Sequence, residues 1–127
     1  MERTGFRPLA FIVAHRVKGV STIQLLTKKL RKSLPSLYAT EDQGMNAIAQ
    51  VKFFCPWNQW TWYATEFDGE DLFFGLVAGH EIELGYFRLS ELSDIRGPFG
   101  LGIERDLWWN PTSLKDIGLK HKERGWT

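Results

Sequence analysis

The chain has 127 residues, of which 43% are hydrophobic and 24% are charged, and its formal net charge is +1. These values fit one domain with its own hydrophobic core, and they exclude an intrinsically disordered chain, which has fewer apolar residues and a larger net charge. Cys55 is the single cysteine, so no disulfide can form within the chain, and the longest early apolar run, residues 9–14, is too short to cross a bilayer. We therefore expect a cytoplasmic protein.

The N-terminal part of the sequence divides into three segments. Residues 1–22 are basic and lack a sustained hydrophobic period, so we expect an extension outside the domain. Apolar residues then recur at helical spacing over residues 23–34, which predicts a helix that Pro35 ends. Residues 36–46 contain Ser, Asp, Gly and Asn and predict a loop.

Four predicted strands follow, each rich in β-branched or aromatic residues. They cover residues 47–54, 60–67, 72–78 and 82–89. Because the gaps between them are short, consecutive strands should pair as antiparallel hairpins. Residues 103–109 are a candidate fifth strand. The sequence therefore predicts an α+β fold, with an antiparallel sheet of four to five strands and flanking short helices.

Two further short helices are predicted, over residues 90–95 and over residues 111–117, where a glycine follows. Between them lies a glycine-rich loop, residues 97–102. The predicted organisation is an N-terminal extension (1–22), a single α+β domain (23–118) and a basic C-terminal tail (119–127).

Several carboxylates are closely spaced in the sequence. They are Glu66, Asp68, Glu70 and Asp71, with Glu104 and Asp106 further along the chain. Such oxygen ligands could bind Mg²⁺ or Ca²⁺ and serve a metal-dependent nuclease or hydrolase. The alternative, which we favour, is a solvated hairpin turn in which Asp68-Gly69 supplies the required backbone conformation. We expect no metal site and no cofactor, since no His or Cys pair has the spacing of a zinc site.

Aromatic residues are the most unusual feature of the composition, with six Trp, nine Phe and three Tyr. In the predicted strand that begins at Trp60, large aromatic residues fall on both faces. One interpretation is a central strand covered on both sides, with Trp62 and Phe74 in the core. The other is a platform that stacks single-stranded nucleic acid, to which Trp57 and Trp60 would belong. We favour the core.

No nucleophile lies in a recognisable catalytic motif. Cys55 has aromatic neighbours in the sequence, and we expect an inert, partly buried thiol because a reactive cysteine needs an activating base. His80 falls in a predicted turn, where a polar residue is ordinary.

The charges are distributed unevenly along the chain. Residues 1–37 carry eight basic residues and one acidic residue, a charge of +7, whereas residues 38–110 carry four basic and twelve acidic residues, a charge of −8. An acidic body repels phosphate, so nucleic acid would have to bind the basic helix or the C-terminal residues Lys120, Lys122 and Arg124, and then only weakly and non-specifically. The basic helix residues are Lys28, Lys29, Arg31 and Lys32. A protein partner with a basic surface fits the central charge better.

Several stretches resemble one bacterial family, the domain-of-unknown-function family 2958. They lie within residues 25–40, 51–54, 60–75, 83–92 and 102–106, so the resemblance covers roughly residues 24–117. It implies an accessory protein of mobile DNA, because such proteins are common on plasmids and integrative conjugative elements. It implies no activity and transfers no functional residue. The segment before the resemblance is either a genuine addition or the product of an upstream start codon, since valine codons such as GUG also start translation and Val20 directly precedes the similar region.

Taken together, these features favour a non-enzymatic binding module of a mobile genetic element that engages a protein partner. The candidate binding residues are Trp57, Trp60, Glu66, Asp68, Glu70, Asp71, Glu104 and Asp106. The alternatives are a metal-dependent nuclease or hydrolase that uses the carboxylates, and a single-stranded nucleic-acid binder that uses the aromatic sheet residues.

Overall fold

The structure is a computed structural model, and it describes residues 24–123. The predicted N-terminal extension, the first residue of the predicted helix and the last four residues of the predicted tail lie outside the described residues.

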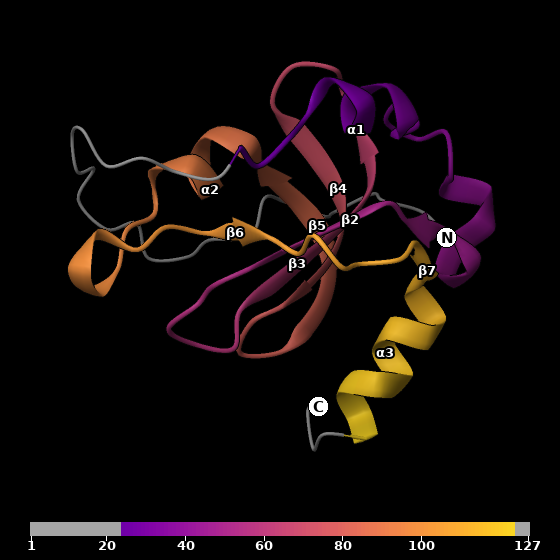
Figure 1. The fold of residues 1–127 in the computed structure, drawn as a ribbon. Helices are drawn as coiled ribbons and strands as arrows, with labels where there is room; N and C mark the ends of the chain where they lie inside the picture. Colours follow the sequence, from indigo (N-terminus) through magenta and orange to yellow (C-terminus); the bar gives the residue numbers. More distant parts are fainter. Residues whose placement is uncertain (1–23, 124–127) are drawn as a thin grey trace.

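A five-stranded antiparallel sheet forms the centre of the domain (Figure 1). Its strands, in spatial order, are β5 (Ile82–Arg88), β4 (Leu72–Ala78), β3 (Thr61–Phe67), β2 (Val51–Phe54) and β6 (Glu104–Arg105). A second, two-stranded sheet pairs β1 (Ile48–Ala49) with β7 (Thr112–Ser113) in antiparallel register. The three central hairpins connect neighbours in the chain, as their short turns require. The predicted α+β fold with an antiparallel sheet is confirmed.

The helices lie on both faces of this sheet (Figure 1). They are α1 (Lys28–Ser33), the 3₁₀ helix η1 (Glu41–Asn46), α2 (Leu89–Asp94), the 3₁₀ turn η2 (Pro98–Gly100) and α3 (Leu114–Glu123). Residues that precede and follow α1, together with α2, pack on the face that carries Trp62 and Phe73. The helix α3 packs on the opposite face, which carries Tyr63 and Leu76.

Because both faces are covered, the strands β3 and β4 are buried along nearly their whole length. Trp62 and Phe74 are 2% and 1% exposed, which confirms their prediction as core residues. The two strands approach closely at Gly75, where a Cβ atom would lie 1.7 Å from the backbone oxygen of Tyr63. Only glycine fits there without moving the neighbouring strand.

Several elements differ from the sequence prediction. The predicted strand 47–54 is divided into β1 and β2, which belong to different sheets, and residues 112–113 of the predicted last helix form β7. The predicted loop 36–46 contains η1. The helix α1 begins at Lys28 because the hydroxyl of Thr27 accepts a hydrogen bond from the backbone N–H of Leu30, at 3.2 Å, and caps the helix there. The helix α3 continues through Gly118 to Glu123, so the first residues of the predicted tail are helical. The predicted fifth strand over residues 103–109 is shorter, since β6 holds two residues and the chain turns after it.

Candidate functional site

Glu66 lies inside the protein, and the prediction of a solvated turn is wrong for this residue. Its side chain is fully buried. One carboxylate oxygen accepts a hydrogen bond from the backbone N–H of Tyr38 at 2.7 Å, and the other accepts from the backbone N–H of Thr40 at 2.9 Å and from the Thr40 hydroxyl. These bonds fasten the segment before η1 to β3, so Glu66 stabilises the fold and is not displayed to a ligand.

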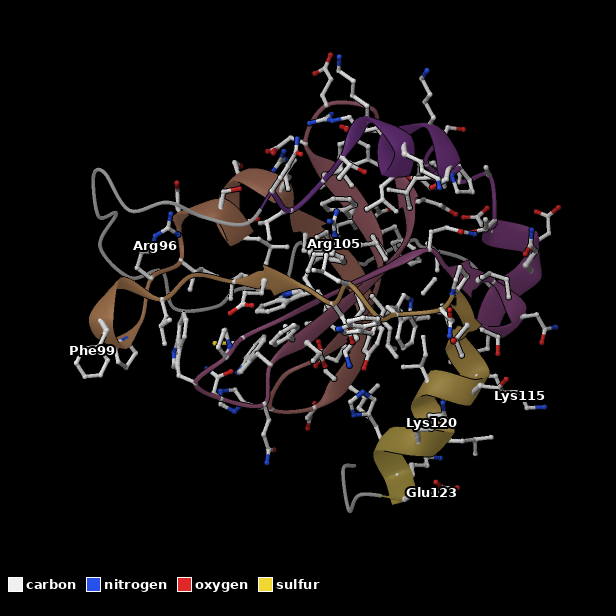
Figure 2. The ribbon with its side chains drawn as sticks, viewed as in Figure 1. Arg96, Phe99, Arg105, Lys115, Lys120 and Glu123 are labelled. Carbon is white, nitrogen blue, oxygen red and sulfur yellow. The ribbon has the colours of Figure 1, made fainter. Side chains whose placement is uncertain are left out.

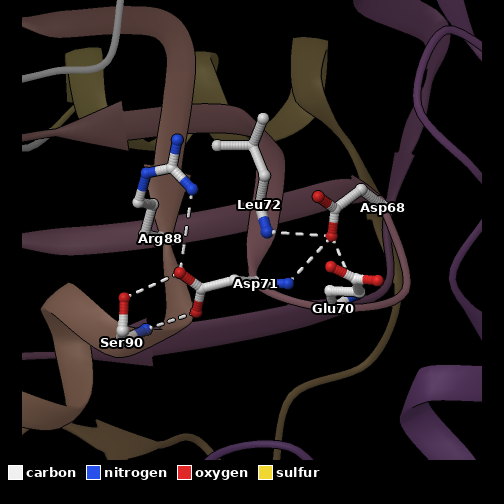
Figure 3. A network of polar contacts seen from close by, with 6 residues as sticks. All are labelled: Asp68, Glu70, Asp71, Leu72, Arg88 and Ser90. Atoms are coloured by element: carbon white, nitrogen blue, oxygen red, sulfur yellow. Dashed lines mark hydrogen bonds and ion pairs between the residues drawn. The ribbon is translucent and has the colours of Figure 1, made fainter.

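Asp68 organises the turn between β3 and β4 (Figure 3). Its Oδ1 accepts hydrogen bonds from the backbone N–H groups of Glu70, Asp71 and Leu72, at 2.8, 2.8 and 3.0 Å. Burial acts to raise the pKa of Asp68, but these three bonds and the charge of Arg88 outweigh it, so the pKa lies below its ordinary value. The predicted turn function of this residue is confirmed.

Asp71 connects the same turn to the start of α2 (Figure 3). Its carboxylate accepts hydrogen bonds from the backbone N–H of Ser90 at 2.8 Å and from the Ser90 hydroxyl at 2.7 Å. It also forms an ion pair with Arg88 at 3.8 Å. A carboxylate at the first turn of a helix satisfies a backbone donor that has no partner within the helix. Most of the acidic run therefore holds secondary structure together.

The other two candidate carboxylates, Glu104 and Asp106, lie in and directly after β6, at the edge of the sheet opposite to β5. Glu104 belongs to β6 and pairs with Phe54 of β2, and Asp106 forms an ion pair with Lys52 at 3.6 Å. Lys52 lies opposite Tyr63, which is roughly 16 Å along β3 from Asp68 at about 3.3 Å per residue. The structure does not bring the two acidic groups together. Within residues 24–123, no group of three or more His, Cys, Asp or Glu side chains is placed to hold a metal ion.

The candidate aromatic platform is largely covered. The ring of Trp57 lies over Gly97, where a Cβ atom would be 2.4 Å from Cε2 of the indole, and the ring of Trp60 covers Gly79 in the same way. Both indoles are half-buried and pack against the core. His80 is exposed, and its ring meets the ring of Trp60 edge to face at 5.4 Å between centroids. The sheet aromatics therefore form core and its rim.

The basic residues of α1 are exposed, as expected for the polar face of an amphipathic helix. Arg31 has a further contact, because its guanidinium lies 5.4 Å from the centre of the Phe67 ring and donates a hydrogen bond to the backbone oxygen of Gly69 at 3.4 Å.

Cys55 is buried, and burial raises the pKa of its thiol against the lowering effect of backbone hydrogen bonds at Trp57 and Asn58. A thiol with a raised pKa is a poor nucleophile at neutral pH.

Sequence reasoning missed one exposed feature, the turn after β6, formed by residues 106–109 and called here the Trp108 turn. Trp108 is 91% exposed and Leu107 is 62% exposed. The turn has a fixed conformation, because Oδ1 of Asp106 accepts a hydrogen bond from the backbone N–H of Trp108 at 2.9 Å and the backbone oxygen of Asp106 accepts from Trp109 at 3.3 Å. An Asp at the start of such a turn is the local signal that could have found it.

Trp109 anchors the Trp108 turn to the sheet. Its ring lies 5.3 Å from the ring of Tyr63, between centroids, and the ammonium of Lys52 lies 5.6 Å from its centre. The backbone N–H of Asp106 donates to the backbone oxygen of Lys52 at 2.9 Å. Of two adjacent tryptophans, one is therefore packed on the sheet, and the other projects into solvent from a braced position.

These observations define the class of the protein as an α+β domain whose sheet is covered on both faces and whose exposed aromatic groups lie in turns. A family model described as "Protein of unknown function (DUF2958)" matches residues 25–117, and the chain belongs to this family. No curated protein and no solved structure matches the chain. Within the described part of the chain, no helix has the length and apolar character needed to span a membrane.

Proposed function

We propose that this protein is a non-enzymatic binding module and that the Trp108 turn binds a protein partner. The observation that carries this proposal is the exposed Trp108, held on a turn that the Asp106 carboxylate and the anchored Trp109 keep in one conformation. Tryptophan is enriched among the residues that dominate protein–protein binding energies. A side chain on a fixed backbone loses less conformational freedom on binding, so more of its burial energy becomes affinity.

The charge of the body supports a protein partner with a basic surface. Residues 38–110, which include this turn, carry a net charge of −8. Such a field speeds the approach of a basic protein and repels a phosphate backbone. The metal-dependent nuclease has less support, because Glu66, Asp68 and Asp71 are occupied by hydrogen bonds within the fold. The single-stranded nucleic-acid binder has less support because the sheet aromatics are covered.

We further propose that this chain is an accessory protein of a mobile genetic element and that its partner is encoded on the same element. This part of the proposal comes from the resemblance to proteins found on plasmids and integrative conjugative elements. It requires that the gene for the partner lie on the same element as the gene for this chain.

Site-specific photo-crosslinking tests both parts. Trp108→p-benzoylphenylalanine places the reactive group on the turn, and the same substitution at Lys115, an exposed position on α3, is the matched control. In the native host, we expect a discrete crosslinked protein at position 108 and none at position 115, and mass spectrometry then identifies its gene. Equal crosslinking at both positions would contradict the binding surface, and a partner encoded outside the element would contradict the mobile-element context.

A titration with labelled DNA and RNA at two salt concentrations tests the class of partner. We expect only weak binding, on the order of 10⁻⁴–10⁻⁶ M, that falls steeply with salt. Nanomolar binding at high salt would refute a protein partner and favour nucleic acid.

A further inference from the structure

The strand β6 forms one edge of the central sheet. It pairs with β2 on one side, and no strand of residues 24–123 pairs with it on the other. Figure 2 shows Arg105 of β6 near the centre of the view, between Phe99 on one side and Lys115 of α3 on the other. The outer side of an edge strand presents backbone N–H and C=O groups with which another chain can pair.

The register of β2 and β6 shows which backbone groups point to this edge. The backbone N–H of Asp106 donates to the backbone oxygen of Lys52 at 2.9 Å, and Phe53 lies opposite Arg105. Bonded and non-bonded pairs alternate along an antiparallel ladder, so Phe53 and Arg105 are a non-bonded pair. The N–H and C=O of Arg105 therefore point away from β2, and no turn or loop hydrogen bond within residues 24–123 uses them.

Two carboxylates lie beside this edge, on one face of the sheet. Glu104 and Asp106 are two residues apart, so their side chains point to the same face. Asp106 forms an ion pair with Lys52 at 3.6 Å, whereas Glu104 has no ion pair within the part of the chain that the structure describes. A strand added at this edge would place alternate side chains beside the two carboxylates, where Lys or Arg is favoured and an acidic residue is repelled.

Exposed apolar side chains also distinguish this edge from the opposite one. Leu101 precedes β6, and Leu107 and Trp108 follow it, and all three are exposed. At the opposite edge, no large apolar side chain of β5 is exposed. Strand addition obtains its affinity from backbone hydrogen bonds and its specificity from side-chain contacts, and the β6 edge offers both.

We propose that an extended, basic segment of the partner protein adds to β6 as a further strand and contacts Trp108 at its end. A segment of about five residues is long enough to run beside residues 103–107. The backbone of Arg105 supplies one donor and one acceptor, Glu104 supplies the complementary charge, and Trp108 supplies the apolar contact. This inference rests on the function proposed for the Trp108 turn and adds the chemistry of the segment that binds there.

A phage library of random linear peptides, selected on the full chain, provides the probes. We expect enriched peptides with Lys or Arg at alternate positions. Arg105→Pro should weaken the binding of these peptides by about tenfold or more, because it removes the outward N–H and places a ring where the added strand lies. An edge strand tolerates proline where the N–H points outward. Arg105→Ala, the matched control, removes the same side chain but keeps the N–H, so the difference between the two variants measures the backbone contact.

Hydrogen exchange of single amides, followed by NMR, gives an independent result. In the free protein, the amide of Arg105 should exchange faster than the amide of Asp106, which is bonded to Lys52. A bound peptide should slow exchange at Arg105.

A charge reversal decides if Arg105→Pro does not fold. Glu104→Lys should weaken peptide binding several-fold, whereas Glu83→Lys, which reverses an exposed carboxylate on the opposite edge strand, should not.

Failure of strand addition is distinguishable from failure of the Trp108 turn. Strand addition is overturned if no peptide is enriched, or if the enriched peptides bind Arg105→Pro as tightly as Arg105→Ala. If a partner still crosslinks at position 108 in that case, the turn remains a binding surface without the added strand. Peptides that depend on Arg105 but bind Trp108→Ala as tightly as the parent would support the strand and contradict the turn.

Discussion

Trp62 in the central sheet and Trp108 in the turn after β6 are the same residue in opposite environments. Trp62 is 2% exposed and packs between the strands and the helices of one face, whereas Trp108 is 91% exposed on a braced turn. Both positions are structurally defined, one by packing and the other by hydrogen bonds that Asp106 accepts from the backbone of the turn. A fixed backbone position therefore does not by itself distinguish a core residue from a surface residue. Only the burial of the side chain shows which tryptophan stabilises the fold.

The acidic residues show the same contrast. Glu66 is buried and accepts hydrogen bonds from a segment that is distant in the sequence, whereas Asp68, two residues later, is exposed and organises its own turn. Both carboxylates stabilise the structure, but removing them should change the free energy of unfolding by different amounts. A buried group that loses its partner cannot form a hydrogen bond with water instead. The core and the turns should therefore respond very differently to matched substitutions.

The largest expected effect is that of Trp62→Ala. Removing a fully buried indole loses its burial energy and leaves a cavity, so the free energy of unfolding should fall by roughly 3–5 kcal/mol. Urea denaturation followed by circular dichroism measures the change. A variant as stable as the parent would show that the ring does not pack in the core.

A smaller loss is expected for Glu66→Ala. The substitution leaves the buried backbone N–H of Thr40 without the acceptor it now has, and a buried unsatisfied group costs about 1–3 kcal/mol. The backbone N–H of Tyr38 also loses its acceptor, but that bond is only partly buried, so its loss adds little. Glu70→Ala removes a neighbouring exposed carboxylate and is the matched control. If denaturation shows equal losses for the two variants, Glu66 does not fasten the segment before η1.

The sheet could be predicted from the sequence because its information is local. The bounds of β4 are those expected, and its neighbours pair through short turns with Asp-Gly or Gly at the corners. The pairing of β1 with β7 could not be predicted, since it joins segments more than sixty residues apart with no local signal. The continuation of α3 through Gly118 has a similar origin: a glycine costs about 1 kcal/mol in a helix, and burial of Ile117 and His121 on the sheet offsets it.

The candidate site was harder to predict than the fold. Burial of Glu66 depends on the backbone of residues 38–40, which only the folded chain brings near β3. The candidate strand over residues 103–109 hid the turn that Asp106 starts. The exposure of Trp108 follows from that turn, because it points one tryptophan of the pair outward and the other onto Tyr63.

Asp68 should give a small, pH-dependent effect. Since its pKa in the folded protein lies below the ordinary value of about 3.9, the ionised carboxylate favours folding, fully so above that value. The contribution is lost as pH falls through the folded pKa. Asp68→Asn keeps an acceptor oxygen but removes the charge, so the parent should be slightly more stable than the variant at pH 6, and the difference should shrink as the pH falls below the ordinary value. A difference that grows with acidity would have the wrong sign for a lowered pKa.

The smallest effect on stability should come from Trp108→Ala, which makes the same chemical change as Trp62→Ala in the other region. The indole at 108 is almost wholly exposed, so its loss removes little buried area and creates no cavity, and the Asp106 bond to the backbone N–H at 108 remains possible with any side chain. Substitutions at such positions are usually within about 0.5 kcal/mol of the parent. Thermal unfolding of the two variants side by side measures the contrast, and the crosslinking partner at position 108 should bind Trp108→Ala more weakly even though the fold is intact. A loss of stability that approaches the loss for Trp62→Ala would mean that the exposed tryptophan belongs to the core after all, and the Trp108 turn would then have no claim as a binding surface.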